Sequence, residues 1–498
     1  MEVLLAIMPI LSIFFFLFIL RQTSLRASFF SYIVSLLIVL LFSPFHLQPG
    51  QIMHATIKGA LICFIVGYVL FFGILLFHLM NKMGSISSIA TFVSHATGDR
   101  LLQTLLLCFG LCPLIESASG FGIGFMIAAP IFLALGYPPM KSAILSFIGL
   151  LASSWGALAT GTIIGTQIIN MDLAKMGAGT ALLSTPVFAY FIVAALVIVG
   201  GWSAVAEKWK ESVVFFLLFS STIYLFSKFV SVELAGILGP IVTTSYGFWL
   251  ARRSRVNKEV YEMQAASLEG EKDSIVKILS PYLFLTVCIL LSRLIPPLQH
   301  VFQDNAVLDL PAYSYRLALL YSPGFWLAMT CIFTIFLLRI PFRIVKESLL
   351  QTSKQWITFA LTTTMFISVS ELMGAAGMHS LLAQVAGNFF GHFFIAVAPL
   401  IGAIGGFLTG SNAGSNAMFM KLQMQTAQHI GLPWEYITMG QNASSSVATI
   451  ASPSRITLGA YICGIPFREN ELLRKTTLLI GGTIVLIIAE MVVWSLFW

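Results

Sequence analysis

Apolar runs long enough to cross a lipid bilayer recur along nearly the whole chain, and no other feature constrains its fold as strongly. Hydrophobic residues make up 58% of the 498 residues, whereas charged residues make up only 9%. A soluble protein of this length could not cover its surface with so few charges. Because a helix satisfies its own backbone hydrogen bonds inside lipid, we expect an all-α polytopic membrane protein.

Hydropathy and its interruptions predict about twelve transmembrane helices. The expected spans are 3–20, 29–45, 60–80, 142–170, 181–203, 212–231, 234–251, 277–295, 323–339, 355–373, 436–462 and 476–497. Two more apolar regions, 101–136 and 393–427, do not fit as single spans, because a cluster of small residues divides each of them. The first run has no basic residues before it and no small-residue cleavage site, so we expect a membrane span there and not a signal peptide.

Basic residues indicate the orientation of the chain. Arg21 and Arg26 follow the first span, so the positive-inside rule places their loop in the cytoplasm and the N-terminus outside. Alternation from there puts the other basic loops inside only if 101–136 and 393–427 each enter and leave on one side. We therefore expect two re-entrant hairpins, the first open to the cytoplasm and the second open to the exterior, with both termini extracytoplasmic.

The two hairpins belong to a predicted internal repeat. Each half of the chain contains a small-residue tip, then a Gly-x-Pro loop, then a span broken by an Ala-Ser-Ser cluster, at Ser153–Gly156 and at Ser444–Ser446. An odd number of spans separates the hairpins, which inverts the second unit relative to the first. We expect a first repeat at 1–203, linking spans with a cytoplasmic loop at 204–275, and a second, inverted repeat at 276–498. Inverted repeats with broken helices are typical of secondary transporters.

The tips and the broken spans are expected to converge on a binding site, because non-helical backbone at membrane depth must face protein or a water-filled cavity. Helix N-termini there offer free N–H groups and a positive dipole end to a small anion. The candidate binding residues are Ser117, Ser119 and Gly120 in the first tip, Ser411, Asn412, Ser415 and Asn416 in the second tip, and Ser153, Ser154, Asn442, Ser444 and Ser445 in the broken spans. The alternative is that the small residues only permit close helix packing, which would not require three asparagines.

Ionisable residues at membrane depth usually have a partner or a function. Glu116 stands at the first tip and is our candidate for a proton carrier, with a helix-capping carboxylate as the alternative. Arg455 follows the second break, and it either pairs with a substrate carboxylate or extends to the cytoplasmic interface. For Glu371, His392 and Lys421 we expect interfacial positions.

Several classes of function lack their signatures in this sequence. No P-loop, no GxGxxG after a strand, no HExxH and no Cys/His cluster occurs, so we expect no enzyme, no cofactor and no bound metal. The net charge of +7 collects in short loops, as membrane topology explains, and no basic face with interleaved aromatics indicates nucleic acid. The six cysteines are isolated and are expected to be small buried hydrophobes.

Three stretches resemble the lactate permease family, which includes glycolate permeases; they are Glu116–Pro139, Phe407–Ala427 and Asn442–Gly464. The resemblance implies a proton-coupled symporter for lactate or glycolate in the bacterial plasma (inner) membrane. Two departures lie in the expected site. Asn412 stands where members of the family carry Asp, and SWGALATGT, beginning at Ser154, replaces an AFGA-x-G-x-P stretch.

We accordingly expect a secondary active transporter that imports a small monocarboxylate by proton symport with alternating access, with lactate as the first choice and glycolate as the second. A sodium-coupled carboxylate carrier with similar hairpins is the open alternative. A passive channel, which would not accumulate substrate, and a lipid-modifying membrane enzyme, which would need a polar catalytic cluster, are more distant alternatives. The expected partners are a monocarboxylate anion, protons and the lipid bilayer.

The predicted topology is testable with single introduced cysteines. A cysteine in the loop 252–275 is expected to react with a membrane-impermeant maleimide only from the cytoplasmic side, and a cysteine in 300–315 only from outside. Labelling of both loops from the same side would contradict the inverted arrangement.

Overall fold

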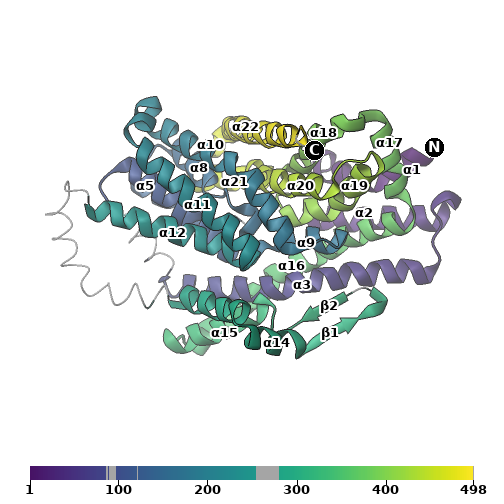
Figure 1. Cartoon of the computed structure of the whole chain (residues 1–498), viewed down its shortest axis with the longest axis horizontal. Helices are drawn as coiled ribbons and strands as arrows, with labels where there is room; N and C mark the ends of the chain where they lie inside the picture. The colour runs from purple at the N-terminus through teal and green to yellow at the C-terminus, as the bar shows by residue number, and fades with distance from the viewer. Residues whose placement is uncertain are drawn as a thin grey trace.

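The chain is almost entirely helical. The computed structural model describes residues 1–85, 88, 97–120, 122–253, 277, 280–313 and 315–496. Within these residues, nine helices are long and apolar enough to cross a membrane, or ten when the bent pair Ser280–Leu294 and Pro296–Asp304 is counted as one span. Most helices lie roughly along the long axis of the molecule (Figure 1). The expectation of an all-α polytopic membrane protein is confirmed.

The helices of the first half of the chain follow the expected spans. They are α1 (Glu2–Phe14), α2 (Ser24–Leu41), α3 (Pro49–Lys82), α5 (Arg100–Leu106), α6 (Cys112–Ser119), α7 (Ile123–Ala134), α8 (Pro139–Ile148), α9 (Gly156–Ile169), α10 (Leu173–Glu207), α11 (Trp209–Phe229) and α12 (Val232–Arg253). A π-helical turn, Leu107–Leu111, joins α5 to α6, and a 3-10 turn, Ser153–Trp155, precedes α9. The cytoplasmic loop expected after α12 lies at 254–276, outside the described residues.

The second half begins with the helix Ser280–Leu294, which is bent by 94° against α14. Its further elements are α14 (Pro296–Asp304), β1 (Val307–Leu310), β2 (Tyr315–Ala318), α15 (Pro323–Leu337), α16 (Phe342–Ala375), α17 (Met378–Phe390), α18 (Phe394–Thr409), α19 (Asn412–His429), α20 (Trp434–Ala448), α21 (Pro453–Ile462) and α22 (Glu469–Ser495). Sequence reasoning missed α17 and also α14 with the antiparallel pair β1–β2, which occupy a segment expected to be a loop.

Helices α3 and α16 form an antiparallel pair with an ion pair near each end. Lys82 Nζ lies 3.0 Å from Glu347 Oε2, and Lys58 Nζ lies 3.0 Å from Glu371 Oε2. The two lysines and the two glutamates are each about 24 residues apart, or roughly 36 Å of helix, which is close to the thickness of a bilayer. The pair therefore reaches across the membrane, with charged groups at both ends.

Two helical hairpins enter from opposite ends of the molecule. In the second hairpin, Gln423 Nε2 of α19 donates to the carbonyl of Ala398 on α18 at 3.0 Å, so the two helices run antiparallel from a tip at Gly410. In the first hairpin, α5 and α6 form one limb and α7 forms the other, with the tip at 120–122. Figure 1 shows α5 toward the left end and α17 and α18 toward the right end.

The first tip depends on glycine. Gly120 and Gly122 have φ angles of 67° and 80°, a conformation that side chains disfavour. A Cβ on Gly124 would lie 2.6 Å from the carbonyl oxygen of Cys112, so only glycine lets α7 pack this closely on α6. The sharp reversal and the close contact together place the tip inside the molecule.

One expected break lies elsewhere than predicted. Helix α20 continues through Ser444–Ser446 to Ala448, and the interruption falls at 449–452, before Pro453. The serine cluster is compatible with a buried helix because Ser444 and Ser446 satisfy their hydroxyls at carbonyls three residues earlier in the same helix. The break forms where proline disfavours a helical residue before it.

In the first broken span, α8 ends at Ile148 and the chain passes through turns to α9 at Gly156. Leu158 and Ala159, in the first turn of α9, have φ angles of 56° and 64°. Left-handed backbone at two consecutive non-glycine residues stores strain, which persists only where the surroundings hold it. This region packs beside the second hairpin, because a Cβ on Gly161 would lie 2.8 Å from the Cβ of Asn412.

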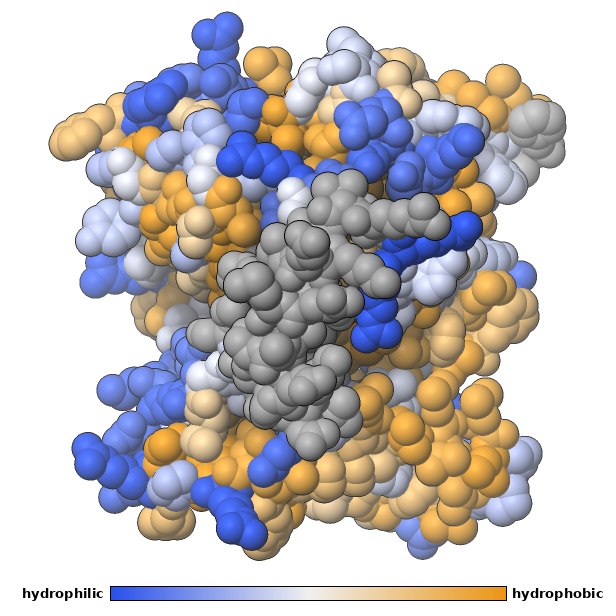
Figure 2. All heavy atoms as spheres, turned by 90° about the vertical axis from the view of Figure 1, so that its left-hand side faces the viewer, coloured by the Kyte–Doolittle hydropathy of each residue, from blue (hydrophilic) through white to orange (hydrophobic). Residues whose placement is uncertain are grey.

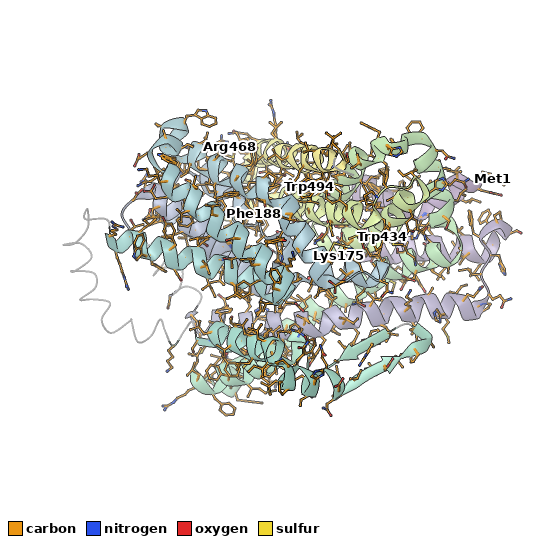
Figure 3. All side chains as sticks on the ribbon, in the orientation of Figure 1. Met1, Lys175, Phe188, Trp434, Arg468 and Trp494 are labelled. Atoms are coloured by element: carbon orange, nitrogen blue, oxygen red, sulfur yellow. The ribbon has the colours of Figure 1, made fainter. Side chains whose placement is uncertain are left out.

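Figure 2 shows hydrophilic side chains gathered in several patches on the left-hand end of Figure 1, among apolar ones. Figure 3 places Arg468 toward that end and Met1 at the opposite end. The orientation in the membrane stays a prediction from the positive-inside rule.

Glu371 lies near one end of the α3–α16 pair, and its side chain is buried between helices; the interfacial depth expected for it stays a prediction. It is 5% exposed, and it contacts Lys421 of α19 as well as Lys58 of α3, at 3.3 Å and 3.0 Å. Lys421 is likewise drawn inward, with 17% of its side chain exposed. His392 is exposed, as an interfacial position requires. Glu371 thus connects the second hairpin to the α3–α16 pair.

Removing this carboxylate is expected to destabilise the fold. Glu371→Gln leaves two partly exposed lysines without the buried carboxylate that they share, which should lower the midpoint of thermal unfolding in detergent by several degrees. Glu347→Gln, at the solvent-exposed end of the same helix pair, is the matched control and should change the midpoint little. Equal midpoints for the two variants would contradict the structural role of Glu371.

Candidate functional site

A carboxylate closes the first hairpin tip. Glu116, in the last turns of α6, accepts the N–H of Gly122 at Oε1 (3.0 Å) and the N–H of Gly124 at Oε2 (3.2 Å). Its side chain is buried, and its charge faces the positive end of α7. The capping geometry that we weighed as an alternative is therefore present.

Arg455 lies between the two tips. Its Nη2 donates to the carbonyl of Gly410 in the second tip (3.4 Å) and lies 3.9 Å from Glu116 Oε1 in the first. Its Nη1 donates to Thr449 Oγ1 in the break between α20 and α21 (3.0 Å). Only 11% of the side chain is exposed, which favours the first of the two alternatives for Arg455, a role at the binding site, over extension to the interface.

Three asparagines meet beside this junction. Asn442 of α20 accepts at Oδ1 from Nδ2 of Asn412 (2.9 Å) and of Asn416 (2.8 Å), both on α19. Its own Nδ2 donates to Thr162 Oγ1 of α9 (3.0 Å) and to Thr180 Oγ1 of α10 (2.9 Å). All five side chains are buried. One amide therefore joins four helices, including both broken spans, without any formal charge.

The polar cluster extends along α19 and α20. Gln441 Nε2 donates to Ser415 Oγ (3.1 Å), and Gln423 Nε2 donates to Gln441 Oε1. Ser445 donates to Asn412 Oδ1. The second tip and the second broken span are thus connected at several points.

The two broken spans also touch directly. Ser154 and Ser446 share a hydrogen bond of 2.6 Å between their hydroxyls, and Thr162 Oγ1 donates to the carbonyl of Ser154 at 2.7 Å. This places Ser154, one of the expected residues, at the contact between the two halves of the chain.

Four expected residues point away from the cluster. The hydroxyls of Ser119, Ser153 and Ser444 donate to carbonyls of their own turns, at Ile115, Leu150 and Gln441. Ser117 faces α12, since a Cβ on Gly236 would lie 2.6 Å from its Oγ, and this oxygen has no partner among the described residues. Gly120 provides the positive φ angle that the turn at the first tip requires.

Sequence reasoning missed several members of the cluster, namely Thr162, Thr180, Gln423, Gln441, Ser446 and Thr449. Gln441 could have been found, because a second amide next to Asn442 at membrane depth needs a partner. Thr162 and Thr180 carry no such signal, since threonine is common inside membrane helices and bonds to its own backbone.

A pocket of about 520 Å³ borders the second tip. Its lining residues are Ser24, Ile123, Met126, Lys354, Gln355, Thr358, Phe359, Thr362, Thr363, Phe366, Thr409, Gly410, Ser411 and Gly414. They come from the two hairpins, from α16 and from the start of α2. No lining residue is acidic, Lys354 is exposed, and Lys354 makes no ion pair within the described part of the chain. The pocket is therefore suited to a small anion with hydrogen-bonding groups.

A second pocket, of about 470 Å³, lies between α10, α11, α20 and α22. Asp172 and Glu490 line it together with Lys175 and Lys228, so its charges balance, and no hairpin tip contributes to it. Figure 3 labels Lys175 and Trp494, which lie on its wall. We place the candidate site at the first pocket, because that pocket borders the tips and their polar cluster.

These features define a class. The protein is a polytopic helical membrane protein whose two hairpin tips and two broken helices meet at a buried polar junction, an architecture found in membrane transporters. The chain belongs to the L-lactate permease family, whose model matches residues 2–497. It is accordingly a multi-pass bacterial membrane permease and not an enzyme.

Its relatives match over nearly their whole length. The L-lactate permease of Escherichia coli (strain K12) is 25% identical over 512 residues, covering 95% of this chain and 92% of its own. The glycolate permease GlcA of the same organism is 25% identical, covering 96% and 92%. The L-lactate permease of Bacillus subtilis (strain 168) is 24% identical, covering 95% and 92%.

The asparagine cluster yields a stability prediction. Asn442→Ala removes the hydrogen-bond partner of Asn412 Nδ2 and of Thr180 Oγ1, at about 1–3 kcal/mol for each unsatisfied group. Asn416 and Thr162 each lose a bond but keep another, to the carbonyls of Gly161 and Ser154. The midpoint of thermal unfolding should fall clearly. Ser444→Ala, two residues along the same helix, removes only a bond within its own turn and is the matched control. A midpoint for Asn442→Ala equal to that of the control would show that the amide is dispensable.

Proposed function

We propose that this permease imports a small monocarboxylate by proton symport, with lactate as the first choice and glycolate as the second. The observation that carries the proposal is the pocket beside the second tip. Six of its lining residues bear hydroxyls, namely Ser24, Thr358, Thr362, Thr363, Thr409 and Ser411. With Lys354 they suit a short carboxylate that itself carries a hydroxyl. The names of the relatives support the same substrates.

The substrate would bind where the tips meet the pocket. Of the residues expected from the sequence, we propose for binding Ser154, Ser411, Asn412, Ser415, Asn416, Asn442, Ser445 and Arg455. The other five shape the tips and the broken spans without contacting the substrate; they are Ser117, Ser119, Gly120, Ser153 and Ser444. Ser411 caps α19 and lines the pocket, so a carboxylate there faces a helix N-terminus. Asn412, Ser415 and Asn416 lie within the next turn, where a small rearrangement would expose their amides and hydroxyl to the pocket.

Glu116 is the proposed proton carrier. It is the carboxylate at the junction of the two tips, and a carboxylate at membrane depth is costly unless paired or protonated. One proton carried with one carboxylate makes the cycle electroneutral, so the pH gradient would drive uptake and the membrane potential would not. A sodium-coupled cycle remains the alternative, since amide and hydroxyl oxygens of the cluster could surround a cation.

Alternating access would involve the two units proposed from the sequence, at 1–203 and 276–498, with linking spans between them. The pocket lies between the hairpin tips and α16, so a movement of the hairpins relative to the α3–α16 pair would open or close it. Hydrogen bonds join the two units, such as the bond between Ser154 and Ser446. During this movement, the bonded segments would either move together or exchange hydrogen-bond partners.

Uptake into proteoliposomes tests the proposal. Labelled L-lactate should accumulate when a proton gradient is imposed, and should not accumulate with a sodium gradient or a membrane potential alone. Unlabelled glycolate should compete, whereas succinate, with its second carboxylate, should not. Accumulation driven by sodium alone would favour the alternative carrier, and equilibration without accumulation would indicate a channel.

A further inference from the structure

The junction of the tips already holds a carboxylate. The Glu116 side chain accepts N–H groups from the start of α7 and lies 3.9 Å from Arg455 Nη2. These are the donors that an incoming carboxylate would use, namely a helix N-terminus of a twelve-residue helix and a buried guanidinium. The protein's own side chain thus occupies an anion-binding position.

A second observation points to a ligand at this position. Ser452, in the break before α21, is 1% exposed, and its hydroxyl has no hydrogen-bond partner among the described residues. It is aimed at the second tip, since a Cβ on Gly410 would lie 3.1 Å from Ser452 Oγ. Buried hydroxyls are nearly always satisfied, so a donor left free beside Arg455 indicates a place where an acceptor can bind.

We propose that the carboxylate of Glu116 and the carboxylate of the substrate compete for one anion subsite, formed by the N–H groups of Gly122 and Gly124, the guanidinium of Arg455 and the hydroxyl of Ser452. This inference rests on the proposed transport of a monocarboxylate and goes further by assigning the subsite and the way in which proton and substrate are linked. The subsite adjoins the pocket, because Gly410 and Ile123 belong both to the pocket wall and to the two tips.

The exchange balances in charge. A proton binds to the Glu116 carboxylate and converts it to a neutral acid, which no longer competes for Arg455 or for the dipole of α7. The substrate carboxylate then takes the vacated donors, and the subsite holds one negative charge beside one positive charge before and after. Release reverses the order: the substrate leaves, Glu116 loses its proton and its carboxylate returns to α7.

Few other ionisable groups face Glu116. Arg455 from α21 and Cys112 from α6 itself act on it. Helices α7 and α9 present Gly122, Gly124 and Gly156 to it. Among the ionisable residues of α3 and α12, which also pack on α6, Lys82 is paired with Glu347 and Glu233 with Arg293. His78 Nε2 of α3 lies 3.3 Å from Gln355 Oε1 of the pocket wall, so the Glu116→Gln variant is needed to assign a pH dependence of substrate binding to Glu116.

The test is equilibrium binding of labelled L-lactate to the purified, full-length protein across a pH series. In the wild type, the affinity should fall as the pH rises, approaching about tenfold for each pH unit, because a proton must be taken up before lactate binds. Glu116→Gln should bind lactate with an affinity that pH does not change, should lose accumulation in a proton gradient, and should keep exchange of lactate across the membrane. Glu490→Gln, which removes a half-buried carboxylate in the other pocket, is the control and should keep the pH dependence of the wild type.

A second measurement uses the wild type alone, so the proposal does not depend on the folding of a variant. Adding saturating lactate to weakly buffered protein should remove about one proton per carrier from solution, as followed with a pH indicator. Lactate binding without proton uptake, or a pH dependence that persists in Glu116→Gln, would overturn the competition. Absence of lactate binding at every pH would instead overturn the proposed substrate, so the two failures are distinguishable.

Discussion

Inside a membrane, every broken helix leaves backbone groups that no water can satisfy, and the centre of this permease depends on how those groups are paired. The first tip presents N–H groups, which a carboxylate accepts; the second tip presents the carbonyl of Gly410, which a guanidinium reaches. Glu116 and Arg455 thus cap opposite kinds of helix end and attract each other across the junction. A single ion pair closes both tips.

In the broken spans, amide side chains make the hydrogen bonds that connect the helices. Asn442 accepts and donates at the same time, so it links α9, α10, α19 and α20 while adding no charge. A charged residue in its place would need a counter-ion and would change the electrostatic potential felt by an anion nearby. The neutral cluster therefore leaves Arg455, Glu116 and the exposed Lys354 as the charges that act on a ligand at the tips.

The sequence predicted the fold class, because apolar length and charge-poor composition are properties of single segments. It placed the second break at Ser444–Ser446, but these serines satisfy their hydroxyls within the helix, and the break lies before Pro453. It placed Asn412, Asn416 and Asn442 together from chemistry alone. It could not identify Thr162 or Thr180, because their hydrogen bonds form only when four helices pack around one amide. It also could not predict that Arg455 points inward, because the turn at Ser452–Pro453 sets that direction.

The charge of the junction also constrains what it can carry. Glu116 and Arg455 form a pair with no net charge in surroundings of low dielectric constant, where an uncompensated charge costs several kcal/mol. A monocarboxylate entering alone would leave the junction with a net negative charge, and a cation entering with it would have to find oxygens that are already engaged in the asparagine cluster. A proton needs only one carboxylate oxygen, and Glu116 provides it beside the donors that the substrate requires. The arrangement therefore favours a proton as the companion of a single negative charge, and it disfavours a dicarboxylate, for which the junction has no second compensating group.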